Sequence, residues 1–580
     1  MTYSIPNLTD RSAHSWEEIH PLVDDLLARD PDPATIDRWL LDWSDLQAGL
    51  HELGARLRVA SVRDTMDPAA EAALKSYLRD IYPNAQIARQ ELTRKLLAYA
   101  DAHGDPPGLE VPLRGLRVDA ALFREENLAL QAAEQENSLA FNKIVGAQTV
   151  VWDGEEQTIT RLAAGYERAN RTERRQIWEL VSARELADRE AINRLWVEVL
   201  SLRMDQAANA GFPDDYRSYR WKLLKRFDYT PEDSKTFQAA IEAVAVPAAG
   251  RVYARRRDRL GVKSLRPWDL DLYQQTYPVN PGSIRAFADE AELLERARVV
   301  FARVDPRIGG YFDRMCEAGM IDFANRIGKG PGAFCTSFEA SRTPFIFGNV
   351  VGKADDVRTL LHEAGHAFHA FETYNLPYYH QRWPPMEFNE VASTAMELLA
   401  APYLTVEQGG FFSPAEAARS RIGHLEKLLL FWPYMAVVDA FQHWVYENPG
   451  WAARPANCDA AWAERWDRFI PWIDWSGMED AKTLGWHRKR HIHRSPFYYI
   501  EYGLAQLGAV QIWARALEDQ SAAVGDYLKG LSLGGTAALP ELYAAAGGRF
   551  AFDRETLGEA VALIETSIRH LEEEDSQETF

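Results

Sequence analysis

The segment from residue 362 to 366 reads H-E-A-G-H and has the side chains to hold a metal ion. On a helix, positions four residues apart project from the same side, so His362 and His366 could direct ring nitrogens at one ion. Zinc accepts imidazole nitrogen and, in catalytic sites, keeps one position open for water. Glu363 follows the first histidine, where its carboxylate could act as general base toward that water. The spacing therefore predicts a hydrolytic Zn²⁺ centre.

A third protein ligand is expected in residues 386–400, which read M-E-F-N-E-V-A-S-T-A-M-E-L-L-A and have the apolar spacing of an amphipathic helix. Glu390 and Glu397 are seven residues apart and share one face of that helix. One of them could ligate zinc while the other hydrogen-bonds a ligand histidine. We expect Glu387, near the helix start, to be a solvated or capping charge. The spacing leaves the choice between Glu390 and Glu397 open.

Two kinds of element must position these side chains. Residues 357–371 place apolar side chains at three- and four-residue steps, which is typical of a helix with one buried face. Residues 333–338 and 344–350 are rich in aromatic and β-branched residues, so we expect two antiparallel strands before this helix. The glycine-rich residues 328–334 fit either a mobile loop beside a cleft or an ordinary hairpin. In the first case the adjacent strand edge could bind an extended peptide.

The rest of the chain has mostly helical spacing. Residues 69–78 and 121–140 are rich in Ala, Leu, Glu and Arg at that spacing. Residues 149–152 read as a short strand followed by an Asp-Gly turn. The apolar run at residues 428–438 is too short to cross a bilayer and is expected to be a buried helix. We therefore predict a mainly α fold with a small β-sheet beside the metal helix.

Several segments resemble one known family. H-E-A-G-H-A-F-H followed by N-E-V-A-S-T-A-M-E-L-L is similar to the thimet-oligopeptidase-like zinc metallopeptidase family, specifically its oligoendopeptidase F branch. P-F-I-F-G-N at 344–349, H-I-H-R-S-P-F-Y-Y-I-E-Y-G-L-A-Q-L-G-A at 491–509 and G-G-T-A-A-L-P-E-L-Y at 534–543 extend the similarity. The resemblance implies a two-lobed, mostly helical metallopeptidase fold with a deep substrate channel for short peptides. It also implies one Zn²⁺ per chain with Glu390 as third ligand, which leaves Glu397 to support a histidine.

A second group of polar side chains lies in residues 491–502. Amide hydrolysis passes through a negatively charged tetrahedral intermediate, which hydrogen-bond donors stabilise. Imidazole and tyrosine hydroxyl groups are suitable donors, although aromatic clusters of this kind usually pack in cores. With the resemblance, we assign catalytic roles to His491, Tyr498 and Tyr502 and substrate binding to Tyr499. Which hydroxyl faces the oxyanion stays open here.

The composition is that of a globular protein, with 47% hydrophobic and 26% charged residues. The formal net charge of −20 argues against broad nucleic-acid binding, which needs basic patches. Three widely spaced cysteines, Cys316, Cys335 and Cys458, do not form a disulfide framework. The first ten residues contain no apolar run, so we expect no signal peptide, no membrane partner and a cytoplasmic location. We place an N-terminal helical lobe at residues 1–195 and the catalytic region at residues 196–580. This division allows the two lobes to be intertwined.

These observations predict a zinc-dependent endopeptidase that hydrolyses short peptides with Glu363 as general base. The nearest alternative is a zinc exopeptidase, a carboxypeptidase or dipeptidyl carboxypeptidase, on a similar helical scaffold. A third reading is a non-catalytic peptide-binding protein with structural zinc. Structural sites usually have four protein ligands, often cysteines. No cysteine lies near residues 362–397, which disfavours that reading.

Overall fold

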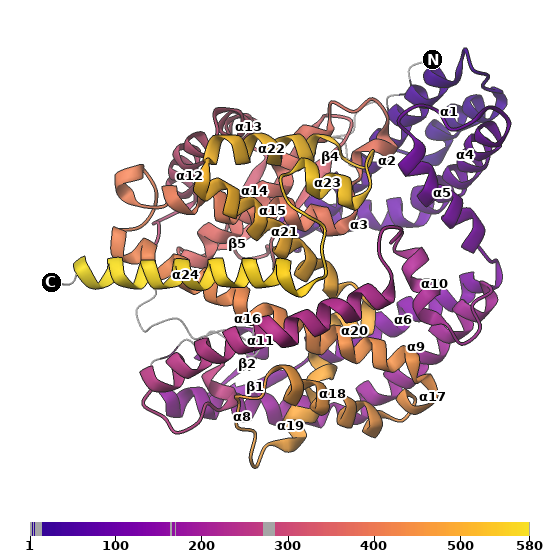
Figure 1. Ribbon diagram of the computed structural model, residues 1–580. Helices are drawn as coiled ribbons and strands as arrows, with labels where there is room; N and C mark the ends of the chain where they lie inside the picture. The colour runs from indigo at the N-terminus through magenta and orange to yellow at the C-terminus, as the bar shows by residue number, and fades with distance from the viewer. Residues whose placement is uncertain are drawn as a thin grey trace. The chain divides into compact units, whose positions relative to one another are not determined.

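The computed structural model describes residues 14–162, 165, 166, 168, 170–270 and 285–578, together with residues 3 and 5. Most of these residues lie in helices, and two small sheets are present (Figure 1). The predicted mainly α fold is therefore confirmed. Most of the first ten residues, for which we predicted no signal peptide, lie outside the described part. Within the described residues, no helix combines the length and the apolar character needed to cross a bilayer.

The chain folds as two compact units, each assembled from three stretches of sequence. Unit 1 contains Met1–Ala121, Ile284–Ala417 and Gly508–Phe550. Unit 2 contains Leu122–Ser283, Ala418–Leu507 and Ala551–Phe580. The division that we placed between residues 195 and 196, and the deep channel, stay predictions.

Unit 1 holds the sheet and the two helices predicted to carry the metal. Its helices are α1 (Trp16–Ala28), α2 (Ile36–Arg63), α3 (Pro68–Ser76), α4 (Tyr82–His103), α12 (Glu290–Val304), α13 (Pro306–Glu317), α14 (Ala354–Thr373), α15 (Met386–Ala400), α22 (Gln520–Ser532) and α23 (Leu539–Ala545). Its strands are β3 (Ile321–Ala324), β4 (Phe334–Phe338) and β5 (Thr343–Val350).

Unit 2 is helical apart from one hairpin. Its elements are α6 (Glu126–Gly146), β1 (Thr149–Trp152), β2 (Glu155–Thr158), α7 (Ile159–Leu162), α8 (Arg171–Ala187), α9 (Arg189–Asn209), α10 (Tyr216–Leu223), α11 (Pro231–Arg259), α17 (Pro449–Ala452), α18 (Pro455–Phe469), α19 (Glu479–Thr483), α20 (Arg490–Arg494) and α24 (Arg554–Glu578). Three helices contribute residues to both units: α5 (Glu110–Leu122), α16 (Pro414–Glu447) and α21 (Tyr499–Glu518).

The sheet of unit 1 has the strand order β3-β5-β4. Strands β4 and β5 pair antiparallel from Phe334↔Phe347 to Phe338↔Thr343, which confirms the two predicted strands. Strand β3 pairs parallel with β5 and was not predicted. Its four residues are too few to show the period-two alternation by which a strand is recognised. Phe338, Phe347 and Val59 of α2 belong to one buried cluster, so α2 packs on this sheet.

Helix α14 follows β5 and lies beside α15 (Figure 1). Asp356 in its first turn accepts hydrogen bonds from the backbone N–H groups of Val351 and Lys353 at 2.8 and 2.9 Å. These contacts satisfy donors at the start of the helix and fix where it begins. The apolar side chains predicted to form the buried stripe of α14 are all buried: Val357, Leu360, Leu361, Ala364, Ala367, Phe368 and Phe371.

The predicted short strand of unit 2 is β1, which pairs antiparallel with β2. The connecting residues Asp153 and Gly154 have φ angles of 52° and 81°. Positive φ at both positions suits the tight hairpin turn that the Asp-Gly pair predicted. The apolar run 428–438 lies within α16 and is buried except at residue 431, so the predicted buried helix is also confirmed.

Candidate metal centre

Three potential ligand side chains converge where α14 and α15 meet. The rings of His362 and His366 have centroids 5.0 Å apart. Oε2 of Glu390 lies 3.6 Å from Nε2 of His362 and 3.8 Å from Nε2 of His366. One ligand atom from each residue lies within 4.8 Å of the others, and the described residues contain no second group of this kind.

This donor set fits a divalent ion. Two imidazole nitrogens and one carboxylate oxygen are a common ligand set of catalytic zinc. Ligand atoms about 2.0 Å from a tetrahedral ion lie about 3.3 Å from one another. The separations of 3.6 and 3.8 Å exceed that spacing by only a few tenths of an ångström. A slight inward movement of the side chains would therefore accommodate one ion.

The two glutamates of α15 contact different atoms of His362. Oε1 of Glu397 lies 2.8 Å from Nδ1 of His362, so an N–H at Nδ1 donates to this carboxylate. In the neutral ring, Nε2, on the side of Glu390, then carries the lone pair. Nε of Arg358 lies 3.7 Å from the other oxygen of Glu397. This geometry favours Glu390 as a ligand and Glu397 as the group that orients His362.

The carboxylate of Glu363 contacts the sheet as well as lying next to the ligand His362 in the sequence. It is 8% exposed and accepts a hydrogen bond from the backbone N–H of Cys335 in β4. Burial raises the pKa of Glu363 to about 7, with contributions of both signs from neighbouring charges. A carboxylate with a pKa near neutrality is a stronger base than an exposed one. The pKa of the Glu363 carboxylate therefore suits a general base.

The close approach of α14 and α15 depends on a glycine. A Cβ at Gly365 would lie 2.6 Å from Cα of Ser393 and 2.7 Å from the carbonyl oxygen of Ala392. Carbon atoms in contact are normally about 3.5–4.0 Å apart, so only glycine allows this distance. The hydroxyl of Tyr527 in α22 donates to the same Ala392 carbonyl oxygen at 2.8 Å, so α22 also holds α15 in place.

Two neighbouring side chains belong to the core of unit 1. His369 is 2% exposed, with its ring edge-on to Phe388 at 5.8 Å, and burial lowers its pKa to about 3. It is therefore a neutral packing residue. The expectation that Glu387 is solvated is wrong, because its side chain is 3% exposed. It lies close to Tyr543 of α23, whose pKa is raised by burial and by the Glu387 charge. A helix distant in sequence covers it, which local spacing did not reveal.

The other predicted residues gather in unit 2. The ring of His491 lies 5.0 Å from that of Tyr499, 5.9 Å from that of Tyr498 and 6.1 Å from that of Tyr502. Burial, followed by the nearby cationic charges, lowers the pKa of His491 to about 4, so its imidazole is neutral at pH 7. Its Nδ1 atom is buried without a hydrogen-bond partner among the described residues. Tyr499 is 7% exposed, whereas Tyr498 and Tyr502 are partly exposed.

The sequence reasoning missed Lys489 in this aromatic group. Its Nζ donates to the hydroxyl of Tyr499 at 2.7 Å and lies 4.0 Å from the centre of the same ring. It also lies 4.7 Å from the ring centre of Tyr434 in α16. The available signal was its place two residues before His491. However, a lysine within the basic run H-R-K-R-H is usually solvated.

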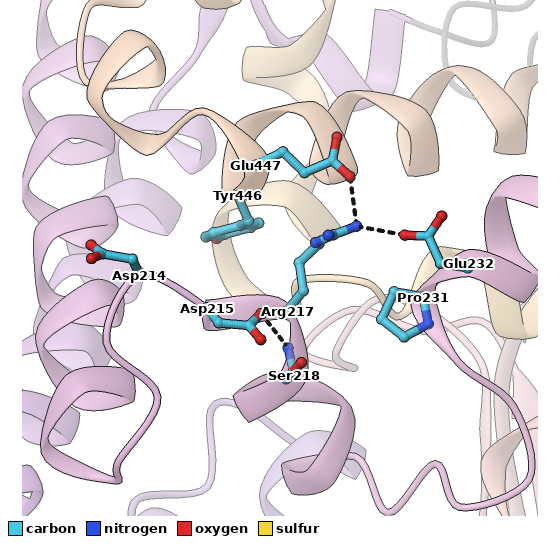
Figure 2. A pocket seen from close by; sticks show the side chains of 8 residues that line it. All are labelled: Asp214, Asp215, Arg217, Ser218, Pro231, Glu232, Tyr446 and Glu447. Carbon is cyan, nitrogen blue, oxygen red and sulfur yellow. Dashed lines mark hydrogen bonds and ion pairs between the residues drawn. The ribbon is translucent and has the colours of Figure 1, made fainter.

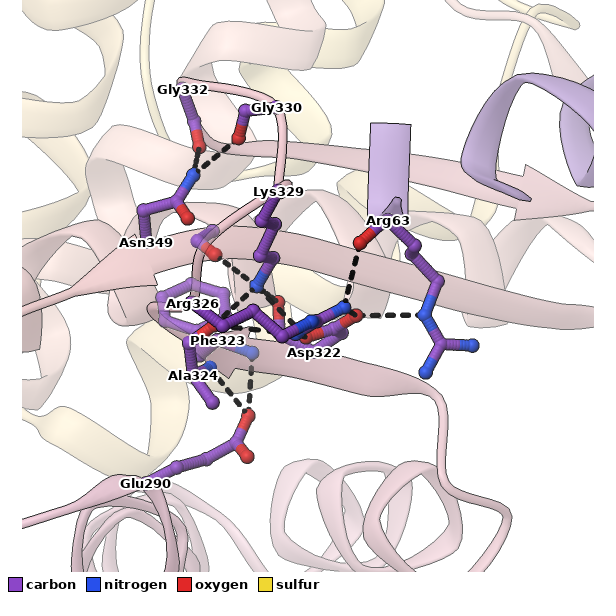
Figure 3. Close-up of polar contacts among 11 residues, drawn as sticks. Arg63, Glu290, Asp322, Phe323, Ala324, Arg326, Lys329, Gly330, Gly332 and Asn349 are labelled. Carbon is purple, nitrogen blue, oxygen red and sulfur yellow. Dashed lines mark hydrogen bonds and ion pairs between the residues drawn. The ribbon is translucent and has the colours of Figure 1, made fainter. Parts of the chain in front are cut away.

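The glycine-rich loop between β3 and β4 is attached to the sheet by a buried lysine (Figure 3). Nζ of Lys329 donates to the Asp322 carboxylate at 2.8 Å and to the Gly348 carbonyl at 2.5 Å. The side-chain amide of Asn349 donates to the Gly330 carbonyl at 2.7 Å. Since β5 lies between β3 and β4, the loop is not a hairpin turn of those two strands. Its first half is held on the sheet.

Unit 2 also contains a polar pocket of about 410 Å³ that includes none of the predicted residues. In it, Arg217 of α10 lies 2.6 Å from a carboxylate oxygen of Glu447 and 3.5 Å from one of Glu232 (Figure 2). The remaining lining residues are Asp214, Asp215, Ser218, Pro231 and Tyr446. Arg217 neutralises part of the charge of these two carboxylates, so the polar lining of the pocket is accounted for by ion pairs within the protein.

Comparison with known proteins finds a matching family, two similar proteins and a similar solved structure. Residues 166–561 match the model of peptidase family M3. An oligoendopeptidase F homologue of Lactococcus lactis subsp. lactis is 28% identical over 197 residues, which are 33% of this chain and 30% of the relative. One of Borreliella burgdorferi is 23% identical over 315 residues, 52% of this chain and 50% of the relative. Each match thus spans half or less of the relative's length. PZ peptidase A, solved with an inhibitor, superposes with a TM-score of 0.84 at 25% identity, over 97% of this chain and 99% of that chain.

Proposed function

Because this chain belongs to peptidase family M3, we propose that it is a zinc-dependent endopeptidase that hydrolyses short peptides. The family assignment confirms the predicted resemblance and the predicted class of metallopeptidase. The convergence of His362, His366 and Glu390 beside Glu363 is the single observation that carries the proposed activity.

We assign the metal to the two imidazoles and the Glu390 carboxylate, and we choose Zn²⁺ because this donor set suits it. When bound, the ion supplies Lewis-acid polarisation of the peptide carbonyl and lowers the pKa of water. Glu397 holds His362 in the tautomer with a free Nε2, supported by the 2.8 Å contact at Nδ1. The carboxylate of Glu397 is itself close to the guanidinium of Arg358.

Glu363 is the proposed general base. Its carboxylate takes a proton from the attacking water and then delivers it to the nitrogen of the leaving amine. The hydrogen bond from the Cys335 backbone orients this carboxylate, and burial keeps its pKa close to neutrality. Both features support proton transfer in each direction during one turnover.

The oxyanion is proposed to accept hydrogen bonds from His491, Tyr498 and Tyr502, with Tyr499 binding substrate. Their clustering supports this role, as does the unpartnered Nδ1 of His491. Fixed donors aimed at developing charge lower the barrier because they need not reorganise.

The outer edge of β4 is the proposed binding site for the substrate backbone. β4 is the edge strand of the sheet β3-β5-β4, and no further strand pairs with it among the described residues. An extended peptide could add to this edge through main-chain hydrogen bonds, which tolerate many side chains. Cys335 in the same strand contacts Glu363, so the edge runs beside the proposed base.

We also propose a cytoplasmic location, short peptides as partners and no nucleic-acid or membrane partner. The net charge of −20 disfavours nucleic acid. Cys316, Cys335 and Cys458 are all unpaired, as is usual in a reducing compartment.

A peptide blocked at both ends tests the proposed function against the exopeptidase alternative. We expect internal cleavage of an acetylated and amidated peptide, loss of cleavage after treatment with a chelator, and recovery when Zn²⁺ is restored. Cleavage restricted to peptides with a free terminus would support an exopeptidase. Metal-independent cleavage would contradict both.

A further inference from the structure

Lys489 is a half-buried cation whose surroundings supply no anion. Its contacts are the hydroxyl of Tyr499 and the faces of the Tyr499 and Tyr434 rings. Other cations nearby in sequence have carboxylate partners: Arg488 lies 3.4 Å from Glu185, and Lys482 lies 2.5 Å from Asp467. No carboxylate forms such a pair with Lys489 among the described residues.

Lys489 and Tyr499 have hydrogen-bond donors that are not engaged within the described residues. An ammonium group has three N–H donors, of which one is given to Tyr499. Because the Tyr499 oxygen accepts that bond, its own hydrogen is left to donate elsewhere. No hydrogen bond donated by this hydroxyl is present among the described residues. Two ammonium hydrogens and one hydroxyl hydrogen therefore remain beside each other. A carboxylate, with several lone pairs on two oxygens, matches this set.

We propose that Lys489 and Tyr499 form a subsite for a carboxylate group of the peptide substrate, with the C-terminal carboxylate as the first candidate. The inference rests on the proposed peptidase function, because His491 and the neighbouring tyrosines are the residues that we assign to the substrate. Lys489 then determines specificity and does not contact the reacting atoms.

The electrostatics of the Lys489–Tyr499 pair agree with an anionic ligand. Burial alone lowers the pKa of Lys489 to about 7. The two tyrosine rings offer the cation only partial compensation for lost hydration. A carboxylate placed against the ammonium would restore the charged form, since an opposite charge at short range favours ionisation.

Matched peptides test the subsite. One internally quenched peptide is prepared with a free C-terminal carboxylate and with a C-terminal amide, and a second pair replaces Glu by Gln within the sequence. KM and kcat are measured for the wild type, Lys489→Met and Lys489→Arg. Lys482→Met is the matched control, because it removes the same charge from a lysine that is paired with Asp467.

For the wild type we expect a KM about tenfold lower for the peptide acid than for the amide, with similar kcat. A factor of about ten corresponds to the binding free energy of one charge-assisted hydrogen bond. Lys489→Met should abolish this preference by raising KM for the acid, whereas Lys489→Arg and Lys482→Met should keep it. A preference for Glu over Gln instead would assign the subsite to an acidic side chain.

Equal KM values for every wild-type pair would overturn the inference without any variant, while leaving the peptidase function intact. An equal loss of activity toward acid and amide in Lys489→Met would reduce Lys489 to a structural residue and also overturn it. Absence of cleavage of all peptides would instead contradict the proposed function.

Discussion

Replacing Gly365 by alanine tests how the metal site is assembled. The new Cβ would lie 2.6 Å from Cα of Ser393, about 1 Å inside the normal contact distance. Because the obstacle is backbone, α14 and α15 must separate by about that amount. Metal–ligand distances tolerate shifts of only about 0.2 Å, so Glu390 would move out of reach of the two histidines. We expect an unfolding free energy lower by about 1–3 kcal/mol and a Zn²⁺ affinity at least about tenfold weaker.

The assay combines urea unfolding with competition against a chromophoric zinc chelator. Gly310→Ala in α13 is the matched control, because nothing lies within 4 Å of its added Cβ. That substitution should raise the unfolding free energy by about 0.5–1 kcal/mol and leave Zn²⁺ affinity unchanged. If Gly365→Ala retained both stability and affinity, the close helix approach would not control the ligand geometry and our reasoning would be refuted.

Three further substitutions have defined outcomes. Glu363→Gln should retain one Zn²⁺ per chain while kcat falls about 10²–10⁴-fold; near-normal turnover would exclude it as the base. Glu397→Gln should weaken Zn²⁺ affinity about 10–100-fold, measured by chelator competition. An effect no larger than that of the same substitution at an unrelated surface glutamate would contradict its role. Burial opposes ionisation of Asp322, but Arg326, Lys329 and Arg63 hold its pKa well below the usual value. Its stabilisation is therefore present above about pH 4 and lost as pH falls. Asp322→Asn should lower the unfolding free energy at pH 7 by about 1–3 kcal/mol, because Lys329 loses its buried partner whereas Arg63 and Arg326 are solvent-exposed. The difference from wild type should shrink in acid, and a pH-independent difference would contradict this.

The spacing of the sequence was enough to predict the helix with its two histidines and the strands β4 and β5. Their signals are local, because one helical turn brings His362 and His366 together and alternating aromatic residues mark a strand. Spacing could not separate Glu390 from Glu397, since both share one face of α15. Their distinct contacts depend on how closely α15 approaches α14, and a sequence pattern carries no information on that distance.

Other features depend on tertiary contacts from distant segments. Glu387 is buried because α23, more than a hundred residues later, covers the start of α15. Strand β3 exists through pairing with β5, not through its own four-residue pattern. Lys489 stands in a basic run that is typical of solvated residues, and only its place between Tyr434 and Tyr499 shows that it is half-buried. Such residues require the fold before their chemistry can be recognised.

We propose that His362, His366 and Glu390 together bind one Zn²⁺. Diffraction from crystals of the Zn²⁺-loaded protein, recorded on both sides of the zinc absorption edge, tests it most directly. We predict one anomalous peak at about 2.0–2.2 Å from a nitrogen of each histidine and an oxygen of Glu390. A peak coordinated by Glu397 instead of Glu390, or the absence of a peak among these side chains, would contradict the assignment.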